Sequence, residues 1–301
     1  MALAAEAVAA VAQAAAGNKI LKYKRIKNNL MKKTIIVAAI IAAAFTTNAQ
    51  APKLPAGTKF KVVAESNNIT SMSMMGQDIE LTNGSKSYAN FHLKSVSGSS
   101  YQLSTSITRI SGSVSAMGNE QTFDSEDASL KSNPMVAEQL KMLNKPIDFT
   151  IENGKVVNTA SAAGSDVLTA LLGQTNGTTD QAKYFLTLPA ASIKPAYQWS
   201  VVDNKPDAAS ESLYVIAEVN ATDISVNVLT NVKLATTLNQ NGMEIKQNTQ
   251  GTIKAKRIYD AKTGLLKSET ATGALKGTMN VMGQDAPIDL KVTTKSSVVP
   301  M

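Results

Sequence analysis

Residues 59–81, KFKVVAESNNITSMSMMGQDIEL, decide the fold class of this chain. In the first part of this stretch, Phe60, Val62 and Ala64 lie at every second position. A period of two places such side chains on one face of a β-strand. In the last part, Gly76 supplies the backbone freedom that a tight turn between two strands needs. The stretch therefore predicts an antiparallel hairpin.

The same alternation recurs along most of the chain. The other predicted strands are residues 79–81, 89–93, 101–107, 147–151, 155–157, 213–219, 224–238, 243–245, 252–259, 265–270, 274–281 and 288–292. Turn sequences separate several of them, namely Asn153–Gly154, Asn241–Gly242, Thr263–Gly264 and Gly283. Short strands joined by tight turns favour a meander of antiparallel strands.

The hydrophobic period changes in a central region, between about Asn133 and Asn144. Val136, Leu140 and Leu143 follow the spacing of one helix face, and Pro134 suits the first helical position. This pattern predicts a short amphipathic helix. Two further short helices, separated by glycine and threonine, are predicted at residues 166–172 and 180–186.

Together these segments predict a mainly β protein with a large curved antiparallel sheet or half-barrel and a few short helices inserted in the middle. Residues 50–301 would form one β-rich domain, or two lobes (50–128 and 199–301) around a helical insert (129–198). Residues 72–78 (MSMMGQD) resemble residues 279–285 (MNVMGQD). Duplication of a β unit explains this repeat, and chance similarity of two turns explains it equally well.

The N-terminal region has the layout of a secretory signal. Lys32 and Lys33 precede an uncharged apolar run at residues 35–45, and small side chains lead to a predicted cut between Ala49 and Gln50. A membrane anchor is the alternative, but it needs about 20 apolar residues, roughly twice this run. We therefore expect an exported protein, periplasmic or extracellular, that is not membrane-spanning.

Residues 1–30 lie upstream of this signal, which begins at Met31 and ends at residue 49. They are rich in alanine and lysine, and their one acidic residue, Glu6, gives the alanine stretch no polar face. We expect them to be a mis-assigned extension; an amphipathic presequence is the competing interpretation.

Charge and composition exclude several classes of function. Residues 1–49 hold seven of the 30 lysines and arginines but one of the 23 acidic residues, so the remainder carries a net charge of +1. The high overall isoelectric point is therefore no argument for nucleic-acid binding. The absence of cysteine excludes disulfides, thiolate nucleophiles and thiolate metal sites. We expect no cofactor.

The pattern resembles an uncharacterised family of exported Bacteroidota proteins, domain of unknown function 6263. The matching parts are the paired Met-Gly hairpins, Phe123–Ser125, Phe149–Val157 with its Asn-Gly turn, Pro195–Trp199 and Tyr259–Leu265. At Pro195–Gln198 the chain departs from the family's Gly-Asp-x-Trp strand start. The resemblance implies an exported location and a fold dominated by β-strands, and the family carries no assigned activity.

Candidate catalytic and metal-binding groups are few. His92 is the only histidine, and it alternates with apolar neighbours, which is typical of a strand residue that faces solvent rather than of a catalytic triad. Glu120, Asp124, Glu126 and Asp127 could supply a carboxylate pair or weak calcium ligands, but they lack calcium-loop spacing and suit a solvated turn. The methionines near residues 72–75, 117, 279 and 282 could hold Cu(I), although methionine is also a common core filler.

These observations favour a non-enzymatic binding or structural module of the cell envelope. The first alternative is a periplasmic carrier of a lipid or other apolar ligand, in which Phe60, Phe91, Ile107, Val226 and Val228 would line a cavity beneath the curved sheet. In the competing interpretation, which the pattern favours slightly, the helices fill the sheet and leave no cavity. The second alternative is a hydrolase with a carboxylate-based site. The expected partners are an apolar small molecule or an envelope protein.

The signal can be tested by mass spectrometry under denaturing conditions on protein from the envelope fraction of the native host. We expect the mass of a chain that starts at Gln50, because the signal peptide is cleaved after Ala49. A mass that retains residues 1–49 would contradict export.

Overall fold

The computed structural model describes residues 54–301, apart from 75–76, 99, 117, 128–139, 141–142, 153, 160–182, 205–207, 241–242 and 282–283. Its strands are β1 (Lys59–Met74), β2 (Gln77–Ser97), β3 (Ser100–Ala116), β4 (Asn119–Asp124), β5 (Ile147–Glu152), β6 (Lys155–Thr159), β7 (Gln198–Asn204), β8 (Ala208–Val219), β9 (Asp223–Gln240), β10 (Met243–Asp260), β11 (Leu266–Val281) and β12 (Gln284–Pro300). A short 3₁₀ turn, η3 (Ala190–Ser192), precedes β7.

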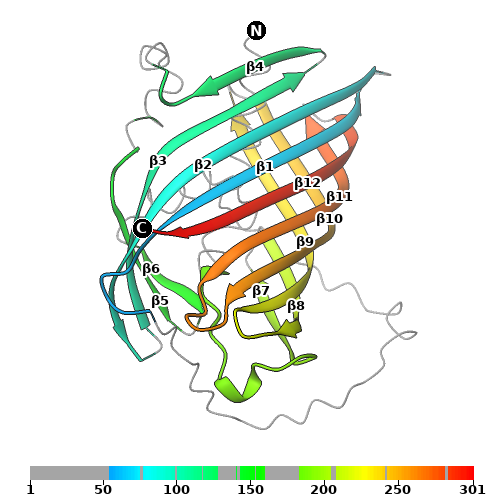
Figure 1. The fold of residues 1–301 in the computed structure, drawn as a ribbon. Coiled ribbons are helices and arrows are strands. Elements are labelled where there is room, and N and C mark those ends of the chain that lie inside the picture. Colours follow the sequence, from blue (N-terminus) through cyan, green and yellow to red (C-terminus); the bar gives the residue numbers. More distant parts are fainter. Residues whose placement is uncertain are drawn as a thin grey trace, which may run out of the picture.

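All twelve strands belong to one antiparallel sheet, in the order β6-β5-β3-β2-β1-β12-β11-β10-β9-β8-β7 (Figure 1). The remaining strand, β4, pairs with Ser111–Ala116 of β3, while β5 pairs with Ser100–Thr105 of the same strand. Among the described residues no pairing joins the two ends of the sheet, so the sheet is not closed. The predicted large antiparallel sheet is confirmed.

The pairing of β1 with β12 joins the two halves of the sheet at its centre. It runs from Phe60 opposite Pro300 to Met72 opposite Ile288. The β1–β2 and β11–β12 hairpins consequently end at the same edge, and the two copies of the Met-Gly repeat lie on neighbouring hairpins. Residues of both predicted lobes therefore contribute to one continuous sheet.

The two faces of the sheet differ in chemistry. We call inner the face that carries the buried side chains, such as Phe60 and Val62 on β1 and Leu266 on β11. The outer face carries the alternate residues, which are mostly lysine, threonine, serine and asparagine. The alternation that predicted the strands therefore also assigned their faces.

Glycines on the inner face allow the sheet to curve. A Cβ added to Gly277 of β11 would overlap the carbonyl oxygen of Asn248 on β10, and one added to Gly251 of β10 would overlap that of Ala274 on β11. On β3, a Cβ on Gly112 would lie 2.7 Å from the ring of Phe123. At these positions the neighbouring strand lies too close to admit a side chain. Glycines at defined positions are also used to introduce curvature into designed sheets.

Several predicted strand boundaries were wrong, because glycines interrupt the hydrophobic alternation within long strands. Residues 79–81 and 89–93 belong to the single strand β2, 243–245 and 252–259 to β10, and 265–270 and 274–281 mostly to β11. The interruptions in alternation coincide with Gly84, Gly251 and Gly273. Gly251 and Gly273 are points of close approach within long strands, whereas Gly84 lies within a long strand and has room for a side chain.

The predicted helices fall mainly outside the described residues. Of the segment 133–144, Leu140 is helical, and Leu143 and Asn144 form a turn. Of the segment 180–186, only Lys183–Leu186 is described, and there the helix prediction was wrong. Lys183 and Tyr184 lie in a 3₁₀ turn, and Phe185 forms a β-bridge with Leu265. Pairing with the end of the sheet outweighs the weak helical period of this segment.

The glycine contacts predict a position-specific cost. Gly277→Ala should lower the free energy of unfolding by about 1–3 kcal/mol or more, because the backbones of β10 and β11 must separate to admit a methyl group. Urea denaturation measures this cost.

Gly84→Ala on β2 is the matched control. Its added Cβ would lie 3.4 Å from the Ser113 Oγ, an ordinary contact, so the stability should change little. Equal losses in the two variants would contradict the role assigned to Gly277.

Candidate functional site

The five residues predicted to line an apolar cavity lie together in one buried cluster on the inner face. They are Phe60 and Phe91, whose rings stack at 5.0 Å, with Ile107, Val226 and Val228. The exposed fraction of each side chain is 5% or less. The structure thus brings all five into the same core.

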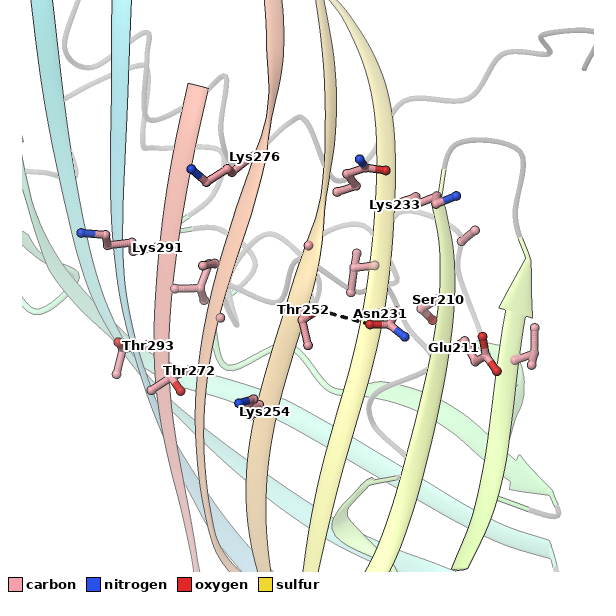
Figure 2. A pocket seen from close by; sticks show the side chains of 18 of the residues that line it. Ser210, Glu211, Asn231, Lys233, Thr252, Lys254, Thr272, Lys276, Lys291 and Thr293 are labelled. Atoms are coloured by element: carbon pink, nitrogen blue, oxygen red, sulfur yellow. Dashed lines mark hydrogen bonds between the residues drawn. The ribbon is translucent and has the colours of Figure 1, made fainter. Parts of the chain in front are cut away.

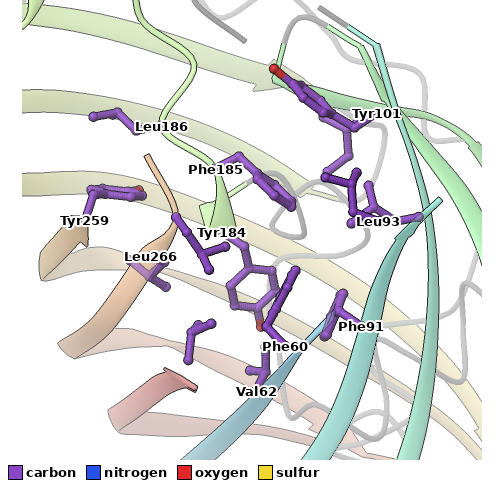
Figure 3. Packing of buried hydrophobic residues seen from close by; sticks show 14 of the residues in the cluster. Phe60, Val62, Phe91, Leu93, Tyr101, Tyr184, Phe185, Leu186, Tyr259 and Leu266 are labelled. Carbon is purple, nitrogen blue, oxygen red and sulfur yellow. The ribbon is translucent and has the colours of Figure 1, made fainter. Parts of the chain in front are cut away.

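A short segment, Lys183–Leu188, packs into this core, and we call it the wedge. The ring centroids of Tyr184 and Phe91 are 5.3 Å apart, and those of Phe185 and Phe60 are 6.1 Å apart. Phe185 also stacks on Tyr101, with 5.6 Å between the ring centroids. Figure 3 shows Tyr184 and Phe185 between the residues of β1–β3 and those of β10–β11. At this level of the inner face, aromatic side chains of the wedge occupy the space between the two halves of the sheet.

The wedge is also held by a buried ionic group. Lys183 Nζ lies 2.9 Å from Glu269 Oε1, and Arg257 Nε lies 2.5 Å from Glu269 Oε2. The exposed fractions of these three side chains are 6%, 11% and 4% for Lys183, Arg257 and Glu269. Burial by itself raises the pKa of Glu269, but the two cations outweigh it and lower the pKa from 4.5 to about 2.

Tyr259 completes the attachment of the wedge to β10. Its hydroxyl donates a hydrogen bond to the Lys183 carbonyl at 3.0 Å, and burial raises its pKa to about 12, so it stays protonated. The Leu186 N–H donates to the Gly264 carbonyl at 2.8 Å. This group was not predicted from the sequence, whose one signal for it is that Arg257 is one of two arginines beyond residue 49.

The sequence-predicted catalytic candidates do not converge on a cleft. His92 lies half-buried on β2, on the outer face, opposite Lys59 and Ser104. Arg109 Nη2 lies 2.5 Å from Asp124 Oδ2, and Arg109 Nη1 lies 3.1 Å from Glu126 Oε2. The hydrogen bond with Arg109 lowers the pKa of Asp124. In the part of the chain that the structure describes, no group of three histidine or acidic side chains could hold a metal ion.

The methionine cluster falls largely outside the described side chains. Met72 and Met279 are half-buried near the ends of β1 and β11. Met75, Met117 and Met282 are not among the described residues, so the choice between Cu(I) binding and core filling stays untested.

The outer face carries a broad groove of about 1150 Å³ across β7–β12, which we call the large groove. Four lysines from four adjacent strands line it: Lys233 on β9, Lys254 on β10, Lys276 on β11 and Lys291 on β12. Of the described residues that line it, Glu211 on β8 is the only acidic one. Figure 2 shows these five side chains around Thr252, whose hydroxyl donates to Asn231 Oδ1 at 3.2 Å.

The strand register explains why these lysines gather. Lys276 of β11 lies opposite Gln250 of β10, and Gln250 lies opposite Lys233 of β9. Lys291 of β12 lies opposite Ala274, which is two residues before Lys276 on β11. All four lysines are exposed. Lys276 contacts Asp289 at 3.4 Å, but both groups are largely in solvent, so this pair neutralises the groove little.

A smaller groove of about 460 Å³, the small groove, adjoins the large one. Its lining combines Leu213 and Val215 of β8 and Leu229 of β9 with Lys254 and Lys256 of β10. Because Lys254 lines both grooves, the two form one continuous surface. This surface offers positive charge, hydroxyl and amide groups, and exposed apolar side chains.

The fold and these grooves define the chain as an all-β protein built on a single open antiparallel sheet. Within this class, residues 165–266 match the profile of a family of unknown function, DUF6263. The matched region contains the wedge and β7–β10. The family resemblance inferred from the sequence is thereby confirmed over this region.

Comparison with curated proteins found no similar sequence. Among solved structures, lipovitellin is 9% identical with a TM-score of 0.48; the alignment covers 82% of this chain but only 25% of lipovitellin. An outer membrane channel from Pseudomonas putida F1 is 10% identical with a TM-score of 0.27, covering 83% of this chain and 98% of the channel. With TM-scores below 0.5, neither assigns a function.

Of the helices within the described residues, none is long and apolar enough to cross a membrane.

The buried ionic group predicts a specific pH dependence of stability. Because folding lowers the pKa of Glu269, its contribution is complete above pH 4.5 and is lost as the pH falls toward 2. Glu269→Gln should therefore cost about 3–5 kcal/mol at pH 7, since it leaves two buried cations without their carboxylate, and much less at pH 2. Urea denaturation from pH 2 to 7 measures this.

Glu65→Gln is the control for this experiment. Glu65 also pairs with a lysine, Lys86, at 2.8 Å, but both side chains are more than a third exposed, so the loss should be small at any pH. A Glu269→Gln curve parallel to that of the wild type between pH 2 and 5 would contradict the assigned role.

Proposed function

We propose that this protein is a non-enzymatic, exported binding module of the cell envelope that holds an anionic ligand in the large groove. The observation that carries the proposal is the composition of that groove, with four lysines from four neighbouring strands against one carboxylate. Export is supported by the signal layout before residue 50.

The charge of the groove is local and not a consequence of overall composition. Beyond residue 49 basic and acidic residues nearly balance, yet the lining of the large groove is strongly basic. Clustered like charges on a surface raise the local concentration of an oppositely charged ligand. The side chains that lie between the lysines, such as Thr252, Asn231 and Thr272, can add hydrogen bonds to phosphate, sulfate or carboxylate oxygens.

The alternative functions have less support in the geometry. An apolar ligand on the inner face would have to displace Tyr184 and Phe185 at the level of Phe60 and Phe91. For a hydrolase, two carboxylates of the densest acidic cluster, Asp124 and Glu126, are already paired with Arg109. Neither arrangement offers a site as accessible as the large groove.

Lysine substitutions test the proposal with a soluble polyanion, low-mass dextran sulfate, as the probe. The double variant Lys254→Gln and Lys291→Gln should bind at least about tenfold more weakly by calorimetry, since each lysine close to an anionic surface contributes about 1 kcal/mol. Raising the salt concentration should weaken wild-type binding, because salt screens exposed charges.

The matched control is the double variant Lys145→Gln and Lys194→Gln, which removes the same charge at exposed positions outside the groove. It should bind the probe nearly as the wild type does. If both double variants lost affinity equally, net charge alone would explain binding and the proposed site would be wrong.

A further inference from the structure

The small groove interrupts the polar outer face with apolar side chains. Leu213 of β8 and Leu229 of β9 lie directly opposite each other, and they are 37% and 38% exposed. Val215 lies two residues along β8 on the same face, and Val202 of β7, 54% exposed, lies opposite the neighbouring Glu211. Single exposed apolar residues are ordinary, but Leu213, Val215 and Leu229 line one groove together.

This apolar strip lies beside the lysines. Leu229 is opposite Lys254 on β10, and Lys256 follows Lys254 on the same face. Lys254 and Thr272 line both grooves, so a ligand that covers Leu213 and Leu229 also meets the basic rows of the large groove. The surface therefore changes from apolar to cationic between adjacent strands.

Two physical requirements select the occupant. Removing the apolar strip from water is favourable only for a ligand with an apolar part. The adjacent lysines require a negative charge beside that part. A second copy of this chain that docked through the same surface would place the same lysines against these lysines, so it would not supply the negative charge.

We propose that the ligand is a single-chain anionic amphiphile. Its alkyl chain would lie over Leu213, Val215 and Leu229, and its acidic headgroup would bind Lys254 and the lysines of the large groove. The small groove, at about 460 Å³, lies within the size range of small-molecule sites. This inference rests on the proposed function and names the class of its ligand.

A series of monoalkyl phosphates, from butyl to decyl and below their micelle concentrations, tests the proposal by calorimetry. For the wild type, affinity should rise about twofold per added methylene, which is less than the roughly fourfold expected for complete burial because the groove is open. The double variant Leu213→Ser and Leu229→Ser should keep the affinity for butyl phosphate and lose the rise with chain length.

The control for that variant is Val157→Ser with Val299→Ser, which removes two apolar side chains that lie outside the grooves and are more exposed than Leu213 and Leu229. It should keep the wild-type dependence on chain length, and unfolding curves of all variants should coincide within about 0.5 kcal/mol, as is usual for surface substitutions.

The outcomes separate the two proposals. Binding of dextran sulfate together with equal affinities for all alkyl phosphates would overturn the amphiphile inference and leave the anion-binding function standing. Failure to bind either probe would overturn both. Binding to phosphatidylglycerol vesicles but not to monomeric alkyl phosphates would also overturn the inference, because the site would then recognise a membrane surface and not a single chain.

Discussion

The close approach of β10 and β11 is the constraint on which this structure depends. At Gly251 and Gly277 the two backbones lie so close on the inner face that a methyl group would overlap a carbonyl oxygen of the neighbouring strand. This contact lets strands of 16–18 residues curve as one layer. Without that curvature, the inner faces of β1–β3 and of β9–β11 could not both reach the wedge, and the core around Phe60 and Leu266 would stay open to water.

The two faces of the curved sheet have different roles. The inner face is occupied by its own wedge, which is held by stacked rings and by the charges of Lys183, Arg257 and Glu269. A buried ion pair contributes modestly to net stability, yet it penalises any other placement of the wedge, because each charge would lose its partner. Among the described residues, none packs over the outer face of β8–β12 in this way, and there the grooves are exposed.

The sequence predicted the fold class because alternation is a local property. Phe60 and Val62 identified their strand and its buried face, and Asn153–Gly154 identified a hairpin whose glycine has a φ of 75°. The same local reasoning ended predicted strands near Gly251 and Gly273, where the alternation is interrupted although the strand continues. The grooves could not be predicted, because Lys233, Lys254, Lys276 and Lys291 meet only through the register of four strands. The buried ionic group was missed because Lys183 lies in a segment that its spacing assigned to a helix.

The central pairing of β1 with β12 has a consequence for how the chain acquires its structure. Residues around Phe60 must find residues around Pro300, among the last of the sequence, before the middle of the sheet exists. Such distant partners make loop closure costly and assembly slow. Until β12 arrives, β1 presents an unpaired edge with apolar side chains on one face, the kind of edge that promotes aggregation. In this topology the pairing of β12 therefore both completes the sheet and removes that edge from solvent.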